Sequence, residues 1–196
     1  TVQLAGLSKD SQVYDRFFSV TPDVSINDIS KTDLIIIPAV NGDMATVIES
    51  NKDFLPWITD QYKHGSEVAS LCVGSFILAS TGLLNGKKCS THWVAANEFR
   101  KLFPDVELVS EKIITDENGI YSSGGANSFW NLLLHLLEKY TTRELAVLFS
   151  KYYEIEIDRN SQSPFIIFKG QSEHHDETIK KTQEFIENNS KEKITI

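Results

Sequence analysis

Residues 68–79 constrain the fold of this chain more than any other segment. Apolar residues up to Leu71 predict a buried strand, and Gly74-Ser75 leads directly into a helix with apolar periodicity. Cys72 therefore stands at a sharp turn between strand and helix, where a side chain is exposed at the carboxyl end of a sheet. The first amides of the helix and the helix dipole predict a stabilised thiolate at this position.

The segments around this turn alternate between strand and helix patterns. Residues 33–38 form an apolar run closed by proline, which is typical of a strand buried on both faces of a parallel sheet. A helix is predicted over residues 52–63, with Gly65 as its stop signal. The alternation predicts an α/β fold: a three-layer α/β/α sandwich with a flavodoxin-like, doubly wound, mostly parallel sheet.

Short strands and longer helices continue through the second half of the chain. Asn118-Gly119 lies between two short strands and predicts a small hairpin with a tight turn. The remaining strands are expected at residues 88–91, 106–109, 113–115 and 120–122, and the remaining helices at 92–102, at 127–140, after a cap at Thr141 or Thr142, and at 175–189.

Composition and charge exclude several classes of function. The chain of 196 residues has a net charge of −8, so it lacks the basic surface expected of a nucleic-acid-binding domain. It shows no apolar run long enough to cross a membrane and no signal peptide, which predicts a cytoplasmic protein without membrane contact. Cys72 and Cys89 form neither a disulfide framework nor a metal-binding pattern, and we expect no metal and no other cofactor.

Several segments together resemble a known family. Residues 70–79, the later Thr91-His92-Trp93 and the run over residues 121–126 are similar to the ThiJ/PfpI group of class I glutamine-amidotransferase-like domains. Cys72 and the Thr91-His92-Trp93 element are specific in combination, whereas either one alone is a weak signal.

The C-terminal part narrows this resemblance. Residues 158–165 resemble the segment found where this domain forms the N-terminal half of AraC-type transcription regulators. Residues 176–196 resemble the linker and first helix that enter the helix-turn-helix domain of those regulators. Within the first of these segments, Arg159 and Gln162 are expected to form either a folding clip or part of a subunit contact.

The resemblance implies two parts of the chain. Residues 1–170 would be the sensor domain, and residues 171–196 the linker and the start of a truncated AraC-type helix-turn-helix domain. Because the chain begins without Met inside an apolar segment and stops directly after a polar helix, we also expect it to be a fragment of a longer protein.

The candidate site lies at the carboxyl edge of the predicted sheet. If the strand ending at Thr91 lies beside the strand ending at Leu71, Cys72 and His92 approach each other, and the imidazole could take the proton of the thiol. The other residues expected to line a small metabolite pocket are Asn41, Gly42, Val73, Gly74, Trp93, Ser123 and Gly124, with Tyr121, Ser122 and Gly125 directed toward the same edge.

Three functions are consistent with this site. We favour a non-catalytic domain that senses an unknown small-molecule effector, forms a homodimer, and acts on DNA through a helix-turn-helix half absent from this chain. The alternative is a cysteine-dependent hydrolase or hydratase with Cys72 as nucleophile, His92 as base, and amides of Val73 and residues 40–42 as oxyanion hole. The third is a redox sensor in which Cys72 is oxidised.

Two departures from the family pattern weaken the enzyme hypothesis. Family members usually begin with an additional strand and helix that carry an acidic residue near the thiol. The sequence starts at Thr1, so this acidic residue cannot be assigned in it. Isonitrile-hydratase-like relatives have a threonine where this chain has Val73. Because a hydrolase of this kind needs an orienting carboxylate, we favour a packing or ligand-sensing role for Cys72.

The other cysteine and histidines are explained without chemistry. Cys89 lies in a predicted buried strand and is expected to be a core residue. His135 falls among leucines on a helix and is expected to be partly buried and hydrogen-bonded, and His64 is expected to cap a helix end. The run His174-His175-Asp176 has no further ligand at metal-like spacing, so it predicts a helix start rather than a metal site.

Overall fold

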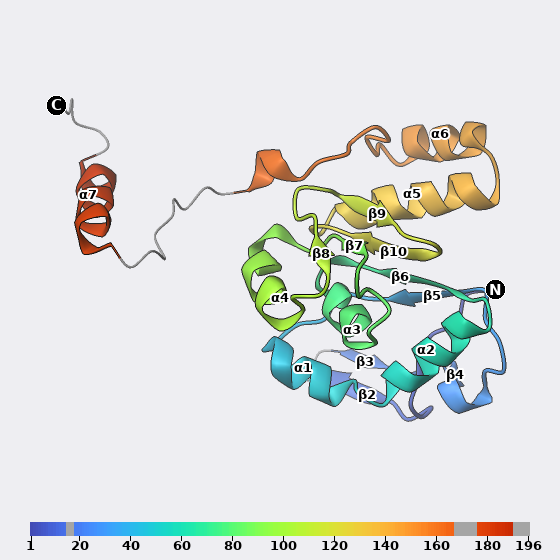
Figure 1. Ribbon diagram of the computed structural model, residues 1–196. Coiled ribbons are helices and arrows are strands. Elements are labelled where there is room, and N and C mark those ends of the chain that lie inside the picture. The colour runs from blue at the N-terminus through green and yellow to red at the C-terminus, as the bar shows by residue number, and fades with distance from the viewer. Residues whose placement is uncertain (15–17, 167–175, 190–196) are drawn as a thin grey trace. The chain divides into compact units, whose positions relative to one another are not determined.

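The computed structural model describes residues 1–14, 18–166 and 176–189. The chain divides into two compact units, Thr1–Pro164 and Phe165–Ile196, and each is described by itself. The first unit is built on a four-stranded sheet of order β5-β6-β10-β9 (Figure 1). The strands of this sheet are β5 (Leu34–Ile37), β6 (Glu67–Ser70), β9 (Ile114–Asp116) and β10 (Ile120–Ser123).

Helices cover the two faces of this sheet. On one face, α5 (Ser128–Tyr140) packs over β10 and β9, and α6 (Arg143–Tyr152) lies on the outer side of α5 (Figure 1). On the other face lie α2 (Phe54–Lys63) and α3 (Ser75–Ser80). Since β5, β6 and β10 run parallel and only β9 is antiparallel, the predicted doubly wound α/β/α fold with a mostly parallel sheet is confirmed.

The turn between β9 and β10 follows directly from its sequence. Asn118 and Gly119 both have positive φ, at 56° and 78°, as a two-residue hairpin turn of the primed type requires. Glu117 and Ile120 exchange backbone hydrogen bonds of 2.9 and 3.2 Å across the turn. The predicted hairpin is therefore confirmed.

The core on the α2–α3 side of the sheet contains a pair of buried aromatic rings. Phe76 and Phe99 are fully buried, and their rings meet edge to face with centroids 5.0 Å apart. Cys89 is also fully buried in this core, and burial raises the pKa of its thiol to about 12. Cys89 is therefore the core residue that the sequence predicts.

One prediction for the first half of the fold is wrong, and one helix was not predicted. Strand β5 is not buried on both faces, because it is the edge strand and α5 packs over β10 and β9; Ile36 is 42% exposed. The helix predicted over residues 52–63 is confirmed as α2, and a separate helix α1 (Met44–Ser50), which was not predicted, precedes it. Asp43 caps α1 by accepting a 2.9 Å hydrogen bond from the amide of Thr46.

The strand predicted to end at Thr91 is shorter than expected and lies elsewhere. Strand β7 (Lys88–Cys89) pairs with β8 (Glu107–Leu108) in a small separate sheet. The neighbour of β6 on that side is β10, which is joined to β9 by the hairpin. Strand β10 pairs with β6 along three residues, from Ile120↔Val68 to Ser122↔Ser70, and so occupies the edge of β6 that the strand before Thr91 would need.

The remaining described elements are short. Strands β1 and β4 form a parallel pair, and β2 and β3 form an antiparallel pair. The bounds of these elements are β1 (Ala5–Gly6), β2 (Gln12–Tyr14), β3 (Phe18–Val20), β4 (Val24–Ser25), η1 (Ile26–Asp28), η2 (Cys72–Gly74), η3 (Trp93–Ala95), α4 (Ala96–Leu102) and η4 (Ser163–Phe165).

The second unit contains helix α7 (Glu177–Asn188). The carboxylate of Asp176 accepts hydrogen bonds of 2.9 and 3.1 Å from the amides of Thr178 and Ile179, so the predicted helix start is confirmed, with Asp176 as its cap. His174 and His175, residues 190–196 and the predicted domain boundary after residue 170 lie outside the described residues. None of the described helices is long and apolar enough to cross a membrane.

Candidate functional site

Cys72 occupies a strained turn at the carboxyl end of β6. Its φ is +54°, in the left-handed region that a residue with a side chain rarely adopts. The turn is fixed on both sides: the amide of Cys72 donates to the hydroxyl of Ser123 at 3.3 Å, and the amide of Gly74 donates to the carbonyl of Leu71 at 2.8 Å. The sharp strand-to-helix turn predicted from the sequence is present.

Gly74 is required by the close approach of β5 to this turn. A Cβ atom at this position would lie 2.4 Å from the carbonyl oxygen of Pro38 and 2.9 Å from that of Ile37. Both contacts are with rigid backbone, so a larger residue cannot be accommodated without moving β5 or the turn. The glycine therefore holds the Cys72 turn against the end of β5.

The pKa of the Cys72 thiol is raised, whereas the sequence predicts a stabilised thiolate. Burial raises the pKa of Cys72, and a hydrogen bond from the backbone N–H of Val73 lowers it by a smaller amount. The predicted stabilisation of the thiolate is therefore wrong. The reason is that the half-buried sulfur loses water, and the hydrogen bond from Val73 does not offset this loss.

His92 is held as a neutral imidazole. Its Nδ1 accepts a 3.1 Å hydrogen bond from the backbone N–H of Val94, which places the ring proton on Nε2. Burial lowers the pKa of His92. In this tautomer the lone pair of Nδ1 accepts the hydrogen bond from Val94, and Nε2 carries the proton and can only donate. The ring therefore has no free basic nitrogen to take a proton from a thiol.

Thr91 brings the segment of His92 to the Cys72 turn. Its buried hydroxyl donates to the carbonyl of Cys72 at 3.3 Å and accepts from the hydroxyl of Ser75 at 2.8 Å. Among the described residues, however, no hydrogen bond joins the Cys72 thiol to the His92 ring, and no acidic side chain contributes to the pKa of either group. The two segments meet, but without the relay that a nucleophilic cysteine needs.

The other residues predicted to line a pocket are distributed unevenly around this turn. Ser123 and Gly124 are buried next to it, whereas Asn41 and Gly42 lie exposed on the loop after β5. Trp93 is half-buried, with its ring centroid 5.6 Å from that of His92. Two further side chains do not point toward this edge as predicted: the hydroxyl of Tyr121 contacts Lys139 on α5, and that of Ser122 accepts a hydrogen bond from the amide of Ser90.

Gln162 is a folding clip, one of the two roles expected for it. Its side chain is 2% exposed. Its side-chain nitrogen donates to the carbonyls of Thr91 at 2.9 Å and Ser110 at 2.6 Å, and its side-chain oxygen accepts from the amide of Gly125 at 3.0 Å. Gly124 packs against the side chain of Gln162. A Cβ atom at position 124 would lie 2.7 Å from the side-chain nitrogen of Gln162, so there is no room for one.

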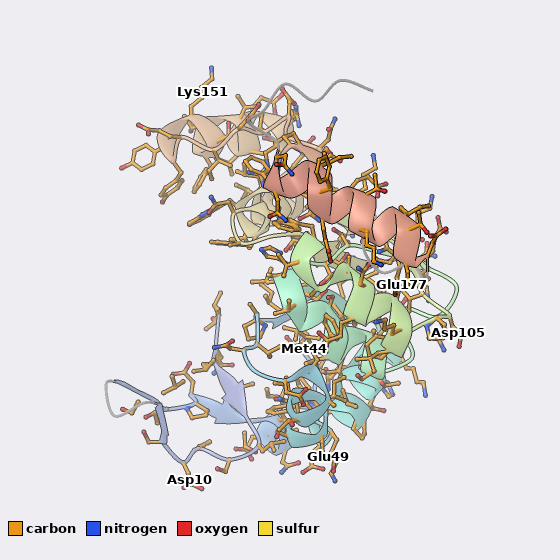
Figure 2. The ribbon with its side chains drawn as sticks, turned by 90° about the vertical axis from the view of Figure 1, so that its left-hand side faces the viewer. Asp10, Met44, Glu49, Asp105, Lys151 and Glu177 are labelled. Carbon is orange, nitrogen blue, oxygen red and sulfur yellow. The ribbon has the colours of Figure 1, made fainter. Side chains whose placement is uncertain are left out.

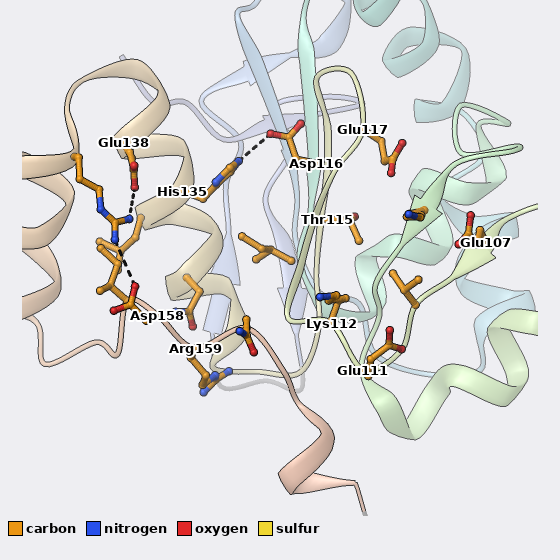
Figure 3. A pocket seen from close by; sticks show the side chains of 18 residues that line it. Glu107, Glu111, Lys112, Thr115, Asp116, Glu117, His135, Glu138, Asp158 and Arg159 are labelled. Carbon is orange, nitrogen blue, oxygen red and sulfur yellow. Dashed lines mark hydrogen bonds and ion pairs between the residues drawn. The ribbon is translucent and has the colours of Figure 1, made fainter.

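A cavity of about 640 Å³ lies between β9, α5 and the segment around Asp158 and Arg159 (Figure 3). Its walls carry paired side chains: the ring of His135 forms a hydrogen bond of 3.0 Å with the carboxylate of Asp116, and Arg143 forms an ion pair with Glu138 at 2.7 Å. His135 is thus the satisfied, partly buried histidine that the sequence predicts. None of the residues predicted to line a ligand pocket lines this cavity. No pattern in the sequence indicates the cavity, because its walls come from segments that are far apart in the chain.

No metal site is formed by the part of the chain that the structure describes: no three His, Cys, Asp or Glu side chains are grouped to hold an ion. His64 caps the end of α2, with Nδ1 2.8 Å from the carbonyl of Asp60, as expected.

The structure is a doubly wound α/β domain with a cysteine in the left-handed region at the end of a central strand. The model of the DJ-1/PfpI family matches residues 1–139. The chain therefore belongs to the DJ-1/PfpI family.

Proteins similar to this chain include both regulators and an enzyme. The HTH-type transcriptional regulator GbdR of Pseudomonas aeruginosa is 31% identical over 143 residues, which are 73% of this chain and 38% of that protein. Isonitrile hydratase of Pseudomonas putida is 28% identical over 120 residues, which are 60% of this chain and 50% of that protein. The chain thus spans well under two thirds of the length of either relative.

A solved structure shares the fold. The AraC family transcriptional regulator from Pseudomonas putida superposes with a TM-score of 0.64 and 17% sequence identity, covering 76% of this chain and 78% of that chain. At this identity the likeness concerns the fold alone.

Proposed function

We propose that this chain is the effector-sensing and dimerising domain of a cytoplasmic AraC-type regulator, and that it does not catalyse a reaction. The effector is a small molecule that binds at the Cys72 turn beside His92, Trp93, Ser123 and Gly124. DNA is bound by a helix-turn-helix domain of the parent protein rather than by these residues. An effector that binds one arrangement of the turn more tightly would shift the balance between active and inactive forms of the parent.

Sequence similarity supports the regulator over the enzyme. The regulator GbdR is more similar to this chain than isonitrile hydratase, over a longer stretch. The acidic net charge of −8 also suits a domain that leaves DNA contact to another part of the protein.

The chemistry of the turn supports a non-catalytic role. A nucleophilic cysteine needs a lowered pKa or a base within reach, and the pKa of Cys72 is raised instead. His92 has its Nδ1 committed to the amide of Val94. A thiol of this kind is suited to packing and to recognition of a ligand.

One observation carries the sensing role: Thr91 hydrogen-bonds both to the Cys72 turn and to Gln162. Its hydroxyl contacts the carbonyl of Cys72 at 3.3 Å, and its carbonyl accepts from Gln162 at 2.9 Å. Gln162 lies just before Pro164, where the first unit ends. Movement of the turn on ligand binding would therefore act on the segment that leads out of the domain.

The test uses the full-length parent protein and this chain side by side. We expect the parent to select a specific sequence from a pool of random DNA duplexes in the presence of competitor DNA, and this chain to select none at the same salt concentration. A parent protein without sequence-specific DNA binding would refute the regulator function.

The alternative is a cysteine-dependent hydrolase or hydratase that uses Cys72 and His92. The similarity to isonitrile hydratase is the observation in its favour. It predicts turnover of an isonitrile or amide substrate by this chain that a Cys72→Ala variant lacks. Turnover that persists in Cys72→Ala would exclude this mechanism, and absence of turnover in the wild type supports the sensing domain.

A further inference from the structure

Helix α6 leaves three of its large apolar side chains, Leu148, Phe149 and Tyr152, exposed. Its most buried residues are small, with Ala146 fully buried and Ser150 5% exposed, and Leu145 and Val147 are half-buried. Leu148 is 60% exposed and Tyr152 78% exposed on the opposite side. A surface helix normally buries its large apolar residues and exposes its small or polar ones. Large apolar side chains that lie exposed together on one helix are typical of a surface that is covered by another molecule.

The exposed apolar surface extends from α6 onto the neighbouring residues. The ring of Tyr153 stacks on that of Trp130 of α5, with centroids 6.4 Å apart and an angle of 15° between the ring planes. Tyr153 also contacts Phe149 and Tyr152, at centroid distances of 5.8 and 5.1 Å. We call Trp130, Leu148, Phe149, Tyr152 and Tyr153 the aromatic patch. Aromatic side chains of this kind are enriched at the centres of protein interfaces.

Two charges of opposite sign stand on the same face of α6. Glu144 lies in its first turn and Lys151 in its last, seven residues and thus about two helical turns apart, with Leu148 between them. Figure 2 shows Lys151 pointing away from the ribbon of this unit. Neither side chain forms an ion pair with another residue that the structure describes.

We propose that the aromatic patch binds the same patch of a second copy of this chain, with the two α6 helices antiparallel about a two-fold axis near Leu148. In this arrangement Glu144 of each copy faces Lys151 of the other, so both ion pairs form at once. A parallel arrangement would instead place Glu144 against Glu144 and Lys151 against Lys151. The charge pattern of α6 therefore selects the antiparallel dimer, which rests on the dimeric regulator proposed above and identifies its interface.

The charge of the whole chain favours this surface for self-association. With a net charge of −8, two copies repel each other over most of their surfaces. The aromatic patch carries no charge, and the two charges that flank it cancel. It is thus a place where two copies can approach without opposing like charges.

The experiment measures the mass of this chain by sedimentation equilibrium over a range of concentrations and at low salt. The wild type is expected to be a dimer. Glu144→Lys alone and Lys151→Glu alone each replace two attractive pairs by repulsive ones and are expected to raise the dissociation constant by about tenfold or more. The double variant Glu144→Lys, Lys151→Glu restores opposite charges and is expected to return the dissociation constant toward that of the wild type.

Leu148→Glu is expected to give a monomer, because it places like charges at the two-fold axis. The matched control is Leu102→Glu on α4, a leucine 44% exposed outside the patch, which is expected to leave the dimer intact. Thermal unfolding of every variant verifies that it is folded.

Two results would overturn the proposal: a wild type that is monomeric throughout, or a dimer that Leu148→Glu and the single charge reversals leave unchanged. The first would indicate that another part of the parent protein covers the patch. Neither result bears on DNA binding by the parent, so the failure of this interface is distinguishable from the failure of the regulator function.

Discussion

The side-chain amide of Gln162 donates a hydrogen bond of 2.9 Å to the carbonyl oxygen of Thr91. Thr91 in turn contacts the carbonyl of Cys72 through its hydroxyl, at 3.3 Å. Two hydrogen bonds therefore connect the strained turn at the end of β6 to the last segment of the first unit. Because all three residues are buried or half-buried, a displacement at one end of this connection cannot be absorbed by water.

Removing the Gln162 amide should destabilise the domain strongly. Gln162→Leu keeps the volume of the side chain but leaves the carbonyl of Thr91 and the amide of Gly125 without this partner, so we expect the free energy of unfolding to fall by about 2–4 kcal/mol. Urea denaturation measures this change. Asn160→Ala, at an exposed neighbouring position, is the control and should change the free energy of unfolding by less than about 0.5 kcal/mol.

A side chain at position 74 should be more harmful than one at another glycine. Gly74→Ala places a Cβ atom 2.4 Å from the carbonyl of Pro38, and we expect a loss of more than about 3 kcal/mol or failure to fold. Gly86 has a φ of +70° but no atom within 4 Å of a Cβ, so Gly86→Ala should cost only about 1 kcal/mol. Equal losses in chemical denaturation of the two variants would contradict the close approach of β5 to the turn.

Cys72 should react slowly with alkylating agents at neutral pH. Since burial raises the pKa of its thiol above the ordinary value of 9.0, the rate of carboxymethylation should still be rising at pH 9. Mass spectrometry of peptides from the folded protein follows the two cysteines separately. Cys89, whose pKa is raised to about 12, is the unreactive control. Fast alkylation of Cys72 at pH 7 would show that its thiolate is stabilised and would favour the enzyme or redox functions.

His92 should make the stability of the domain depend on pH on the acid side. Its pKa is lower in the folded protein than the ordinary value of 6.5, so the unfolded chain binds the proton more tightly. The contribution of His92 is therefore complete above pH 6.5 and is lost as the pH falls from there toward the folded pKa. Urea denaturation at several pH values should show a smaller loss of stability over this range for His92→Gln than for the wild type; identical profiles would contradict the burial of the neutral ring.

The sequence predicts those parts of the fold that local patterns determine. The apolar runs at β5 and β6, the Asn118-Gly119 turn and the apolar face of α5 each specify their own element, and the alternation of strands and helices specifies the layers. The small sheet of β7 and β8 was not predicted, because the pairing of β6 with β10 rather than with the strand before Thr91 depends on contacts between distant segments. The exposure of Ile36 follows from the same cause, since it depends on where α5 lies.

The candidate site was predictable in position but not in chemistry. The residue pattern around Cys72 is sufficient to place a cysteine at a strand-to-helix turn, and the strained φ of +54° agrees with it. The pKa of the thiol and the tautomer of His92 depend on burial and on a single hydrogen bond from Val94, which no sequence pattern reports. The side-chain contacts of Gln162 likewise join residues more than fifty positions apart, so only the fold reveals which of its two expected roles it has.

The most direct test of the central claim is the sequence of the native gene beyond the codon for Ile196. A sensing domain of an AraC-type regulator predicts about a hundred further residues with two helix-turn-helix units that are basic on their recognition helices. A reading frame that closes near Ile196, together with an acidic residue encoded upstream of Thr1 and suited to orient a catalytic group at Cys72, would contradict the regulator and favour the enzyme.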